Sequence, residues 1–229
     1  MSINHLAFDI ETVPAVPLTE YSEAVQTKVN EKIERGRERN PDYDYNYFAS
    51  IHGDFGKVIC ISLGYVTKEG GIKLKSIYGD DEAQVLTDFN EAIAKSGRKF
   101  IHYNGLGFDI PFLLQRMAHH GIRLSNSNFA DLRRYSTQNH FDLMMVYYNW
   151  DLYRALPLGI LAELHHIPSP KEDLSGGKVY AAYEAGQWKR IAHYCEFDVA
   201  TTLNLWNKIY RHRPVIDVSG YRFSSELPE

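Results

Sequence analysis

The amino-acid sequence predicts one mixed α/β domain built around a central sheet. The first observation is the order of its elements: short apolar runs typical of buried strands alternate with longer segments whose apolar residues recur every three or four positions. The second is the composition, 44% hydrophobic and 24% charged, as in an ordinary globular protein. The third is that no internal repeat or glycine- and serine-rich linker divides the chain. We therefore expect a single domain over residues 1–229.

Each element is predicted from a local pattern. Val25, Val29 and Ile33 recur every four residues in a charged segment, which indicates a mostly exposed helix. Residues 42–56 are rich in Tyr, Gly, Asp and Asn, and we expect an irregular loop there. In chain order, the expected elements are a strand at 5–10, that helix at 20–39, a hairpin at 57–66 and 72–78, a helix ending near 97, a strand at 100–103, a helix at 109–120, a mostly helical stretch at 141–164 and a long helix at 187–211.

The overall charge and the cysteines restrict the classes of function. The formal net charge of −4 argues against a broad, sequence-independent grip on duplex DNA, which needs a strongly basic face. Cys60 and Cys195 have no metal or redox spacing, so we expect buried thiols in a reducing compartment. The N-terminus does not resemble a signal peptide, and no apolar run reaches the roughly 20 residues that span a bilayer. We expect a cytoplasmic protein with no membrane contact.

The first candidate motif is a pair of acids, Asp9 and Glu11, at the end of the first predicted strand. Side chains alternate along a strand, so both carboxylates point to the same face. Two like charges at this spacing repel each other unless a cation lies between them. Alone, the pair is equally typical of exposed polar residues at a strand end.

The second motif runs from Asn104 to Asp109, where a strand ends, glycines allow a tight turn and Asp109 opens a helix. Asp is also a preferred helix N-cap, and Pro111 suits a first helical turn. Asp109 alone is therefore explained equally well as a cap. Phe108 alone is more typical of a core residue than of a stacking platform.

The third motif lies on the final helix and includes Tyr194 and Asp198, which are four residues apart and share a helical face. His193 and Asp198 offer a second possible pairing. At about 100° per residue, an i,i+4 pair diverges by about 40° and an i,i+5 pair by about 140°. The helical geometry therefore favours Tyr194 over His193 as the partner of Asp198.

Together, the three motifs resemble the DxE, NxxxFD and YxxxD motifs of the DEDD, or DnaQ-like, 3′→5′ exonucleases. Residues 8–12 and 104–114 are especially similar to the proofreading exonuclease domain of family-B DNA polymerases. The resemblance covers nearly the whole chain except residues 14–56, which we interpret as a family-atypical helix-plus-loop insertion. It implies a ribonuclease H-like fold, with a central mixed sheet flanked by helices, and the tyrosine class of the superfamily.

The resemblance also implies the chemistry. Asp9, Glu11 and Asp198 would bind two divalent ions, Mg²⁺ or Mn²⁺, with Asp109 binding directly or through water. Tyr194 would orient the attacking water. The residues implied to contact the terminal nucleotide of a single-stranded DNA or RNA 3′ end are Thr12, Asn104 and Phe108.

Several alternatives stay open at this stage. The same acids would serve a 3′→5′ exoribonuclease, a non-catalytic nucleic-acid binding module could share the fold, and a polymerase partner is not predicted either way. Asp142 lies where relatives carry an extra acid, or it caps a helix. The residues that could stack on bases or hold phosphates, or else only pack or lie at the surface, are Tyr43, Tyr45, Tyr47, Phe48, Lys171, Lys178, Lys189 and Arg190.

Overall fold

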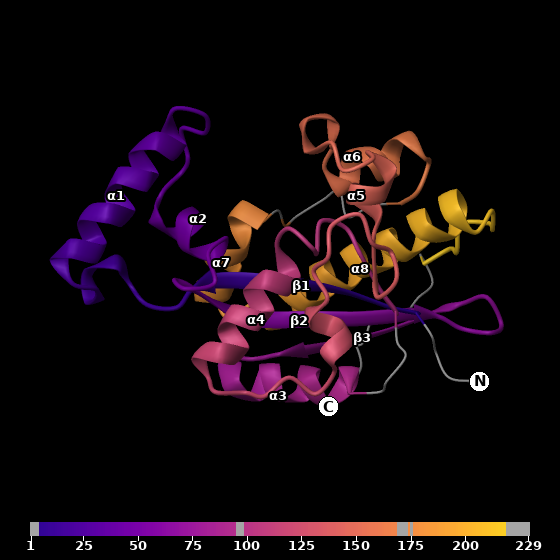
Figure 1. The fold of residues 1–229 in the computed structure, drawn as a ribbon, viewed down its shortest axis with the longest axis horizontal. Helices are drawn as coiled ribbons and strands as arrows, with labels where there is room; N and C mark the ends of the chain where they lie inside the picture. Colours follow the sequence, from indigo (N-terminus) through magenta and orange to yellow (C-terminus); the bar gives the residue numbers. More distant parts are fainter. Residues whose placement is uncertain (1–4, 95–98, 169–173, 175, 219–229) are drawn as a thin grey trace.

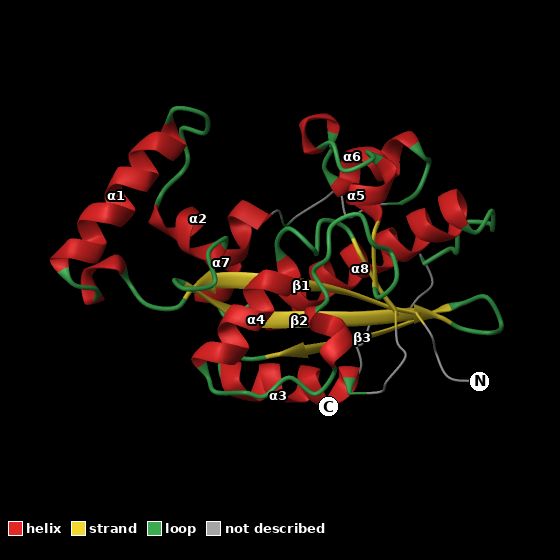
Figure 2. Ribbon diagram, viewed as in Figure 1, coloured by secondary structure: helices red, strands yellow, loops and turns green. Residues whose placement is uncertain are grey.

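The computed structural model describes residues 5–94, 99–168, 174 and 176–218. A five-stranded mixed sheet runs through it in the order β3-β2-β1-β4-β5 (Figure 1, Figure 2). The strands are β1 (His5–Pro14), β2 (Gly56–Val66), β3 (Ile72–Tyr78), β4 (Lys99–His102) and β5 (His140–Asp142). β1 is antiparallel to β2 and parallel to β4, and β4 is parallel to β5. The predicted central mixed sheet is therefore present.

Helices cover both faces of this sheet. Alternation along β1 points Phe8 and its even-numbered neighbours toward α3 and α4, whereas Ala7 and Val13 face the core built on α8. The helices are α1 (Glu23–Arg37), α2 (Tyr45–Ser50), α3 (Glu82–Ile93), α4 (Asp109–His119), α5 (Leu143–Tyr147), α6 (Leu158–Leu164), α7 (Gly176–Glu184) and α8 (Trp188–Tyr210). Short 3-10 turns occur at Leu18–Glu20, Ser127–Ala130 and Leu152–Arg154. Among the described residues, none of these helices combines the length and apolar character needed to cross a membrane.

β1 is longer than predicted and corrects the expected position of its two acids. The predicted strand ended at residue 10, but β1 continues to Pro14. Its pairing with β2 extends to the register Pro14↔Gly56, with a bulge between Glu11 and Thr12. Asp9 and Glu11 therefore lie inside a strand, not at its end. Acidic residues disfavour strands on propensity alone, and the ladder to β2 overrides that preference here.

β1 also extends beyond its other neighbour. The pairing of β1 with β4 covers only His5–Ala7 and Lys99–Ile101. Beyond Ala7, the edge of β1 on this side has no strand partner among the described residues, and the turn between β4 and α4 occupies the space beside it. This uneven sheet leaves room for polar side chains next to Asp9 and Glu11.

Three other regions differ from the sequence-based prediction. The stretch at 141–164 begins with a strand, because His140–Asp142 pairs with β4, and continues as short helices. The loop expected at 42–56 contains α2, whose N-terminus is capped by the Asp44 carboxylate accepting from the Tyr47 backbone N–H. Helix α7 was not predicted. The exposed helix expected at 20–39 is confirmed as α1, with Val29 and Ile33 buried.

Candidate active site

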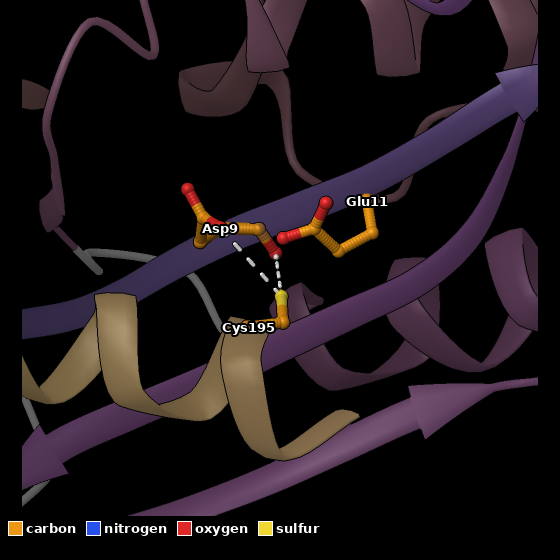
Figure 3. A group of neighbouring side chains, drawn as sticks. All are labelled: Asp9, Glu11 and Cys195. Atoms are coloured by element: carbon orange, nitrogen blue, oxygen red, sulfur yellow. Dashed lines mark hydrogen bonds between the residues drawn. The ribbon is translucent and has the colours of Figure 1, made fainter. Parts of the chain in front are cut away.

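β1 and α8 bring three potential ligands together on one side of the sheet (Figure 3). One ligand atom each from Asp9, Glu11 and Cys195 lies within 4.8 Å of the other two. The Cys195 thiol, on α8, donates to the backbone oxygen of Asp9 at 3.3 Å and lies 3.7 Å from its Oδ2. Sequence reasoning missed this interaction, because Cys195 is 186 residues from Asp9 and has no motif spacing. The thiol helps to hold the Asp9 carboxylate in place.

The turn after β4 carries Asp109 to the same place. Asn104 adopts a left-handed backbone conformation, with φ of 65°, and its carbonyl accepts from the backbone N–H groups of Gly107 and Phe108. Gly105 packs so closely on His102 that a Cβ there would lie 2.5 Å from the imidazole ring. This tight path ends at Asp109, the buried first residue of α4. The Asp109 carboxylate accepts from the backbone N–H of Ile10, between the two acids of β1.

Helix α8 supplies the remaining groups. The hydroxyl of Tyr194 is hydrogen-bonded to Asp198, one turn further along the same face. Burial raises the pKa of Tyr194, and the charges of Asp198, Glu11 and Asp9 raise it further. The His193 ring instead packs against Phe197, 6.3 Å away between centroids. The structure therefore brings Tyr194, and not His193, toward the acids.

The four acids repel one another electrostatically. Burial, followed by the charges of neighbouring acids, raises the pKa of Asp9 and of Glu11 well above the usual range. Burial also raises the pKa of Asp109 to about 7, against the opposing effect of His102. Burial raises the pKa of Asp198 to about 7, although its hydrogen bond from Tyr194 opposes the change.

No ion pair with lysine or arginine is recorded within the described ranges for Asp9, Glu11, Asp109 or Asp198. Buried carboxylates without a cation are costly unless one is supplied. Hard oxygen donors clustered in this way fit Mg²⁺ or Mn²⁺. The site therefore has the donor set and the unbalanced negative charge of a divalent-metal site.

The residues expected to contact substrate lie around these acids. Thr12 follows Glu11 in β1, and its hydroxyl donates to the Ser50 carbonyl at 2.5 Å. Asn104 is half-buried in the turn before α4. Phe108 packs its ring against Phe112, 5.6 Å away, at the edge of the core, so only part of the ring is exposed.

Asp142 has a larger part than the sequence indicated. Its Oδ1 accepts from the backbone N–H groups of Asn104 at 2.9 Å and Met145 at 3.2 Å. Its Oδ2 accepts from the backbone N–H of Leu106 at 3.0 Å and lies 3.2 Å from Nδ1 of His102. Burial alone would raise the pKa of Asp142, but His102 and these backbone donors lower it. Asp142 therefore both caps α5 and anchors the turn that leads to Asp109.

The candidate stacking and phosphate-binding residues separate into groups. Phe48 is buried and Tyr45 donates its hydroxyl to the Val16 carbonyl, so these two pack α2 onto the body. Lys178 and Tyr47 line a cavity that includes Thr12, and Tyr43 lines a neighbouring cavity that Tyr47 also borders. Lys189 and Arg190 line a different cavity, at the start of α8. Lys171 lies outside the described residues.

Comparison with known proteins identifies related sequences and folds. The family described as predicted 3′-5′ exonucleases related to the exonuclease domain of PolB has a profile that matches residues 48–227. The structure of the family B DNA polymerase from the hyperthermophilic archaeon Pyrobaculum calidifontis is similar, with a TM-score of 0.59 and 21% identity over 91% of this chain and 25% of that one. E. coli Exonuclease I in complex with a 5cy-dA13 oligonucleotide gives a TM-score of 0.45 and 12% identity, over 90% and 41%. No curated protein matches the chain.

The likeness to the polymerase bears on the fold alone. The five-stranded mixed sheet with its flanking helices is ribonuclease H-like, which confirms the predicted fold class. The chain spans about a quarter of the length of that polymerase. The activity of the whole polymerase therefore does not transfer to it.

Proposed function

We propose a function from one premise: the chain belongs to the family of predicted 3′-5′ exonucleases related to the exonuclease domain of PolB. We propose that it is a metal-dependent 3′→5′ exonuclease that hydrolyses the terminal phosphodiester bond of single-stranded nucleic acid, with DNA as the preferred substrate. The observation that carries this proposal is the group of four neighbouring acids with raised pKa values and no recorded lysine or arginine partner in the described part of the chain. Such a group is costly to fold and suits a cation-dependent reaction.

The acids divide the task of holding the cations. Asp9, Glu11 and Asp198 would hold two Mg²⁺ or Mn²⁺ ions, and Asp109 would hold them directly or through water. When bound, these ions would supply Lewis-acid stabilisation of the charge that develops on the phosphate. Cys195, on α8, keeps the Asp9 carboxylate in position from the same side of the sheet.

Tyr194 and the neighbouring polar residues act on water and substrate. The raised pKa of Tyr194 keeps its hydroxyl protonated, so it orients the attacking water as a hydrogen-bonding group and not as a base. The water attacks the terminal phosphorus, and the 3′ oxygen of the preceding nucleotide leaves. Thr12, Asn104 and the exposed part of Phe108 would contact the terminal nucleotide.

The same proposal covers the extent of the domain and the compartment. Residues 1–229 form one exonuclease domain, into which about residues 14–56 are inserted, and the family profile begins near the end of that insertion. Both cysteines are free and buried, which suits the reducing cytoplasm.

A gel assay with 5′-labelled single-stranded DNA and RNA of matched sequence tests the proposal. With Mg²⁺ or Mn²⁺, we expect a ladder that shortens from the 3′ end, faster for DNA, and no product in EDTA or with Asp9→Ala. Faster shortening of RNA would make the protein an exoribonuclease. Binding without cleavage of either strand would make it a binding module.

The tyrosine assignment has its own test. We expect Tyr194→Phe to lower kcat by about 100-fold, because the water loses its positioning group. His193→Ala is the matched control on the adjacent helical position and should change kcat far less. The reverse ranking would assign the histidine class.

A further inference from the structure

The insertion and α7 enclose a groove that starts next to the acids. A cavity of about 520 Å³ begins at Thr12, the residue after Glu11, and passes between α2 and the start of α7. A second cavity of about 530 Å³ lies between the end of α1 and the loop before α2. The two share Asn40 and Tyr47 in their walls, so they lie next to each other and together form the groove. Figure 1 shows α1, α2 and α7 gathered at the end of β1.

We propose that this groove binds the unpaired strand on the 5′ side of the scissile phosphate. The inference rests on the proposed exonuclease function and extends it to the upstream nucleotides. Each cavity falls within the roughly 300–1,000 Å³ typical of small-molecule sites. The groove therefore has room for the uncut nucleotides upstream of the reacting centre.

The far cavity carries an aromatic platform. The rings of Tyr43 and Tyr47 lie 4.8 Å apart at an angle of 53°, and Tyr47 is 39% exposed. Tyr43 packs directly on α1 at Gly36, where a Cβ would lie 2.6 Å from the ring. Glycine at position 36 leaves room for this close approach, which fixes the Tyr43 ring against α1. Partly exposed rings that are fixed in place suit sequence-tolerant stacking with bases.

The charges along the groove are mixed. Arg35, Arg39 and Lys178 are exposed cations in its walls, and none of them has an ion pair recorded within the described residues. The walls also contain three acids: Glu38, Asp42 and Asp44. A groove of this kind does not attract nucleic acid by charge alone. Stacking on the tyrosines supplies affinity, and the cations pair with individual phosphates.

A hydrogen bond connects one wall of the groove to the strand that carries Asp9 and Glu11. The bulge after Glu11 redirects β1, and the hydrogen bond from Thr12 to Ser50 joins β1 to the end of α2. Helix α2, which carries Tyr47, is therefore held in a fixed position relative to the acids of β1. A strand seated in the groove would present its 3′ end to them.

The dependence of activity on substrate length tests the groove. We would measure KM and kcat of the full chain on a 5′-labelled thymidine dinucleotide and on an oligothymidylate of about 12 nucleotides, a length within known single-strand site sizes. For the wild-type protein, we expect KM to be about 10-fold lower for the longer strand. We expect this length dependence to disappear in Tyr47→Ala.

The salt dependence tests the pairing of the cations with phosphates. In Arg39→Gln and Lys178→Gln, we expect the slope of log affinity against log salt concentration for the longer strand to fall by about 0.7 for each phosphate that is no longer neutralised. The matched controls are Lys68→Gln, in the exposed turn between β2 and β3 at the other end of the sheet, and Tyr153→Ala, which is 98% exposed (Figure 1). Both should keep the wild-type length and salt dependence.

The outcomes separate this inference from the function on which it rests. If the wild-type protein cleaves both substrates but Tyr47→Ala keeps the full length dependence, the groove does not bind the strand. The same conclusion follows if Tyr153→Ala or Lys68→Gln produces the loss instead. If the wild-type protein cleaves neither substrate, the proposed exonuclease function itself fails.

Discussion

Two sets of buried carboxylates in this protein have opposite surroundings. Glu82, on α3, is 6% exposed and accepts hydrogen bonds from Arg116 at 2.6 and 2.9 Å, from His120 at 2.7 Å and from the Val58 backbone at 2.7 Å. Burial alone would raise the pKa of Glu82, but these partners lower it. At the candidate site Glu11 and Asp109 are buried to a similar extent, and Asp9 and Asp198 are half-buried, yet the pKa values of all four acids are raised.

The difference distinguishes a structural carboxylate from the four acids for which we propose a function. The protein satisfies Glu82 with its own cation, so the pair joins α3 to α4 and needs nothing from solution. The four acids of the candidate site have no such cation recorded among the described residues, and their mutual repulsion lowers stability in the absence of metal. A perturbed pKa therefore indicates function only together with the identity of its partners.

The largest expected effect of a substitution is at the candidate site. We expect Asp9→Asn to lower activity by about 1,000-fold or more, as loss of a central catalytic group does in other hydrolases. The metal-free variant should be at least as stable as the wild-type protein, because one repelling charge is removed. Cleavage assays and thermal melts in EDTA measure both effects. Loss of activity accompanied by a lower Tm would instead give Asp9 the structural character of Glu82.

The opposite result is expected at Glu82. Arg116→Met leaves a buried charge without its cation, so we expect unfolding to become easier by about 3–5 kcal/mol. Activity per folded molecule should change little. Urea unfolding measures the stability, and the double variant Glu82→Gln/Arg116→Met should recover at least half of the loss. A cost below about 1 kcal/mol would mean that this pair behaves as a surface ion pair.

Asp142 is a third kind of buried carboxylate, because backbone N–H groups and the His102 ring surround it in place of lysine or arginine. We expect Asp142→Asn to lower activity by about 10- to 100-fold, the usual cost of losing a group that orients metal ligands. Its amide can accept through only one oxygen, so the turn before Asp109 loosens. The matched control is Asp151→Asn, an exposed cap that accepts from the Tyr153 backbone. Equal effects in both variants would reduce Asp142 to a helix cap.

The dependence of stability on pH is the smallest expected effect, and the two sets differ in its sign. The pKa values of Asp109 and Asp198 rise from 3.8 to about 7 on folding, so unfolding releases protons in between. The metal-free protein should therefore lose stability as pH rises from about 4 to 7. Glu82, whose pKa is lowered, contributes stability that is lost as pH falls below 4.5.

Thermal melts in EDTA across this range measure the slope. Asp198→Asn should flatten it, and saturating Mg²⁺ should abolish the fall by stabilising the ionised site. A slope that persists in Asp198→Asn would assign the pH dependence to other groups.

That the acids lie near one another could be predicted because each lies in a short motif tied to one element, and their catalytic role stays a prediction. Asp9 and Glu11 alternate on one strand, and Tyr194 and Asp198 share one helical face. The sequence left the role of Asp142 open, because a strand of three residues has no periodicity from which its pairing with β4 could be predicted. The interactions of Cys195 and the partners of Glu82 depend on packing between distant elements, which no local pattern encodes.

The extent of β1 shows the same limit. Two acids resemble a strand end, but pairing with β2 carries the strand through them. Helix α2 depends on its Asp44 cap and on burial of Phe48, and the abundance of turn-forming residues concealed both. Local propensity is therefore least informative where long-range pairing or burial decides.

The sequence separation of 186 between Asp9 and Cys195 has a consequence for how the protein is made. This region cannot be completed early in synthesis, because the chain is made from the N-terminus and Cys195 comes late in it. A nascent chain that has not reached Tyr194 holds at most three of the four acids and lacks the tyrosine. Unfinished polypeptides still attached to messenger RNA would thus carry an incomplete set of these residues.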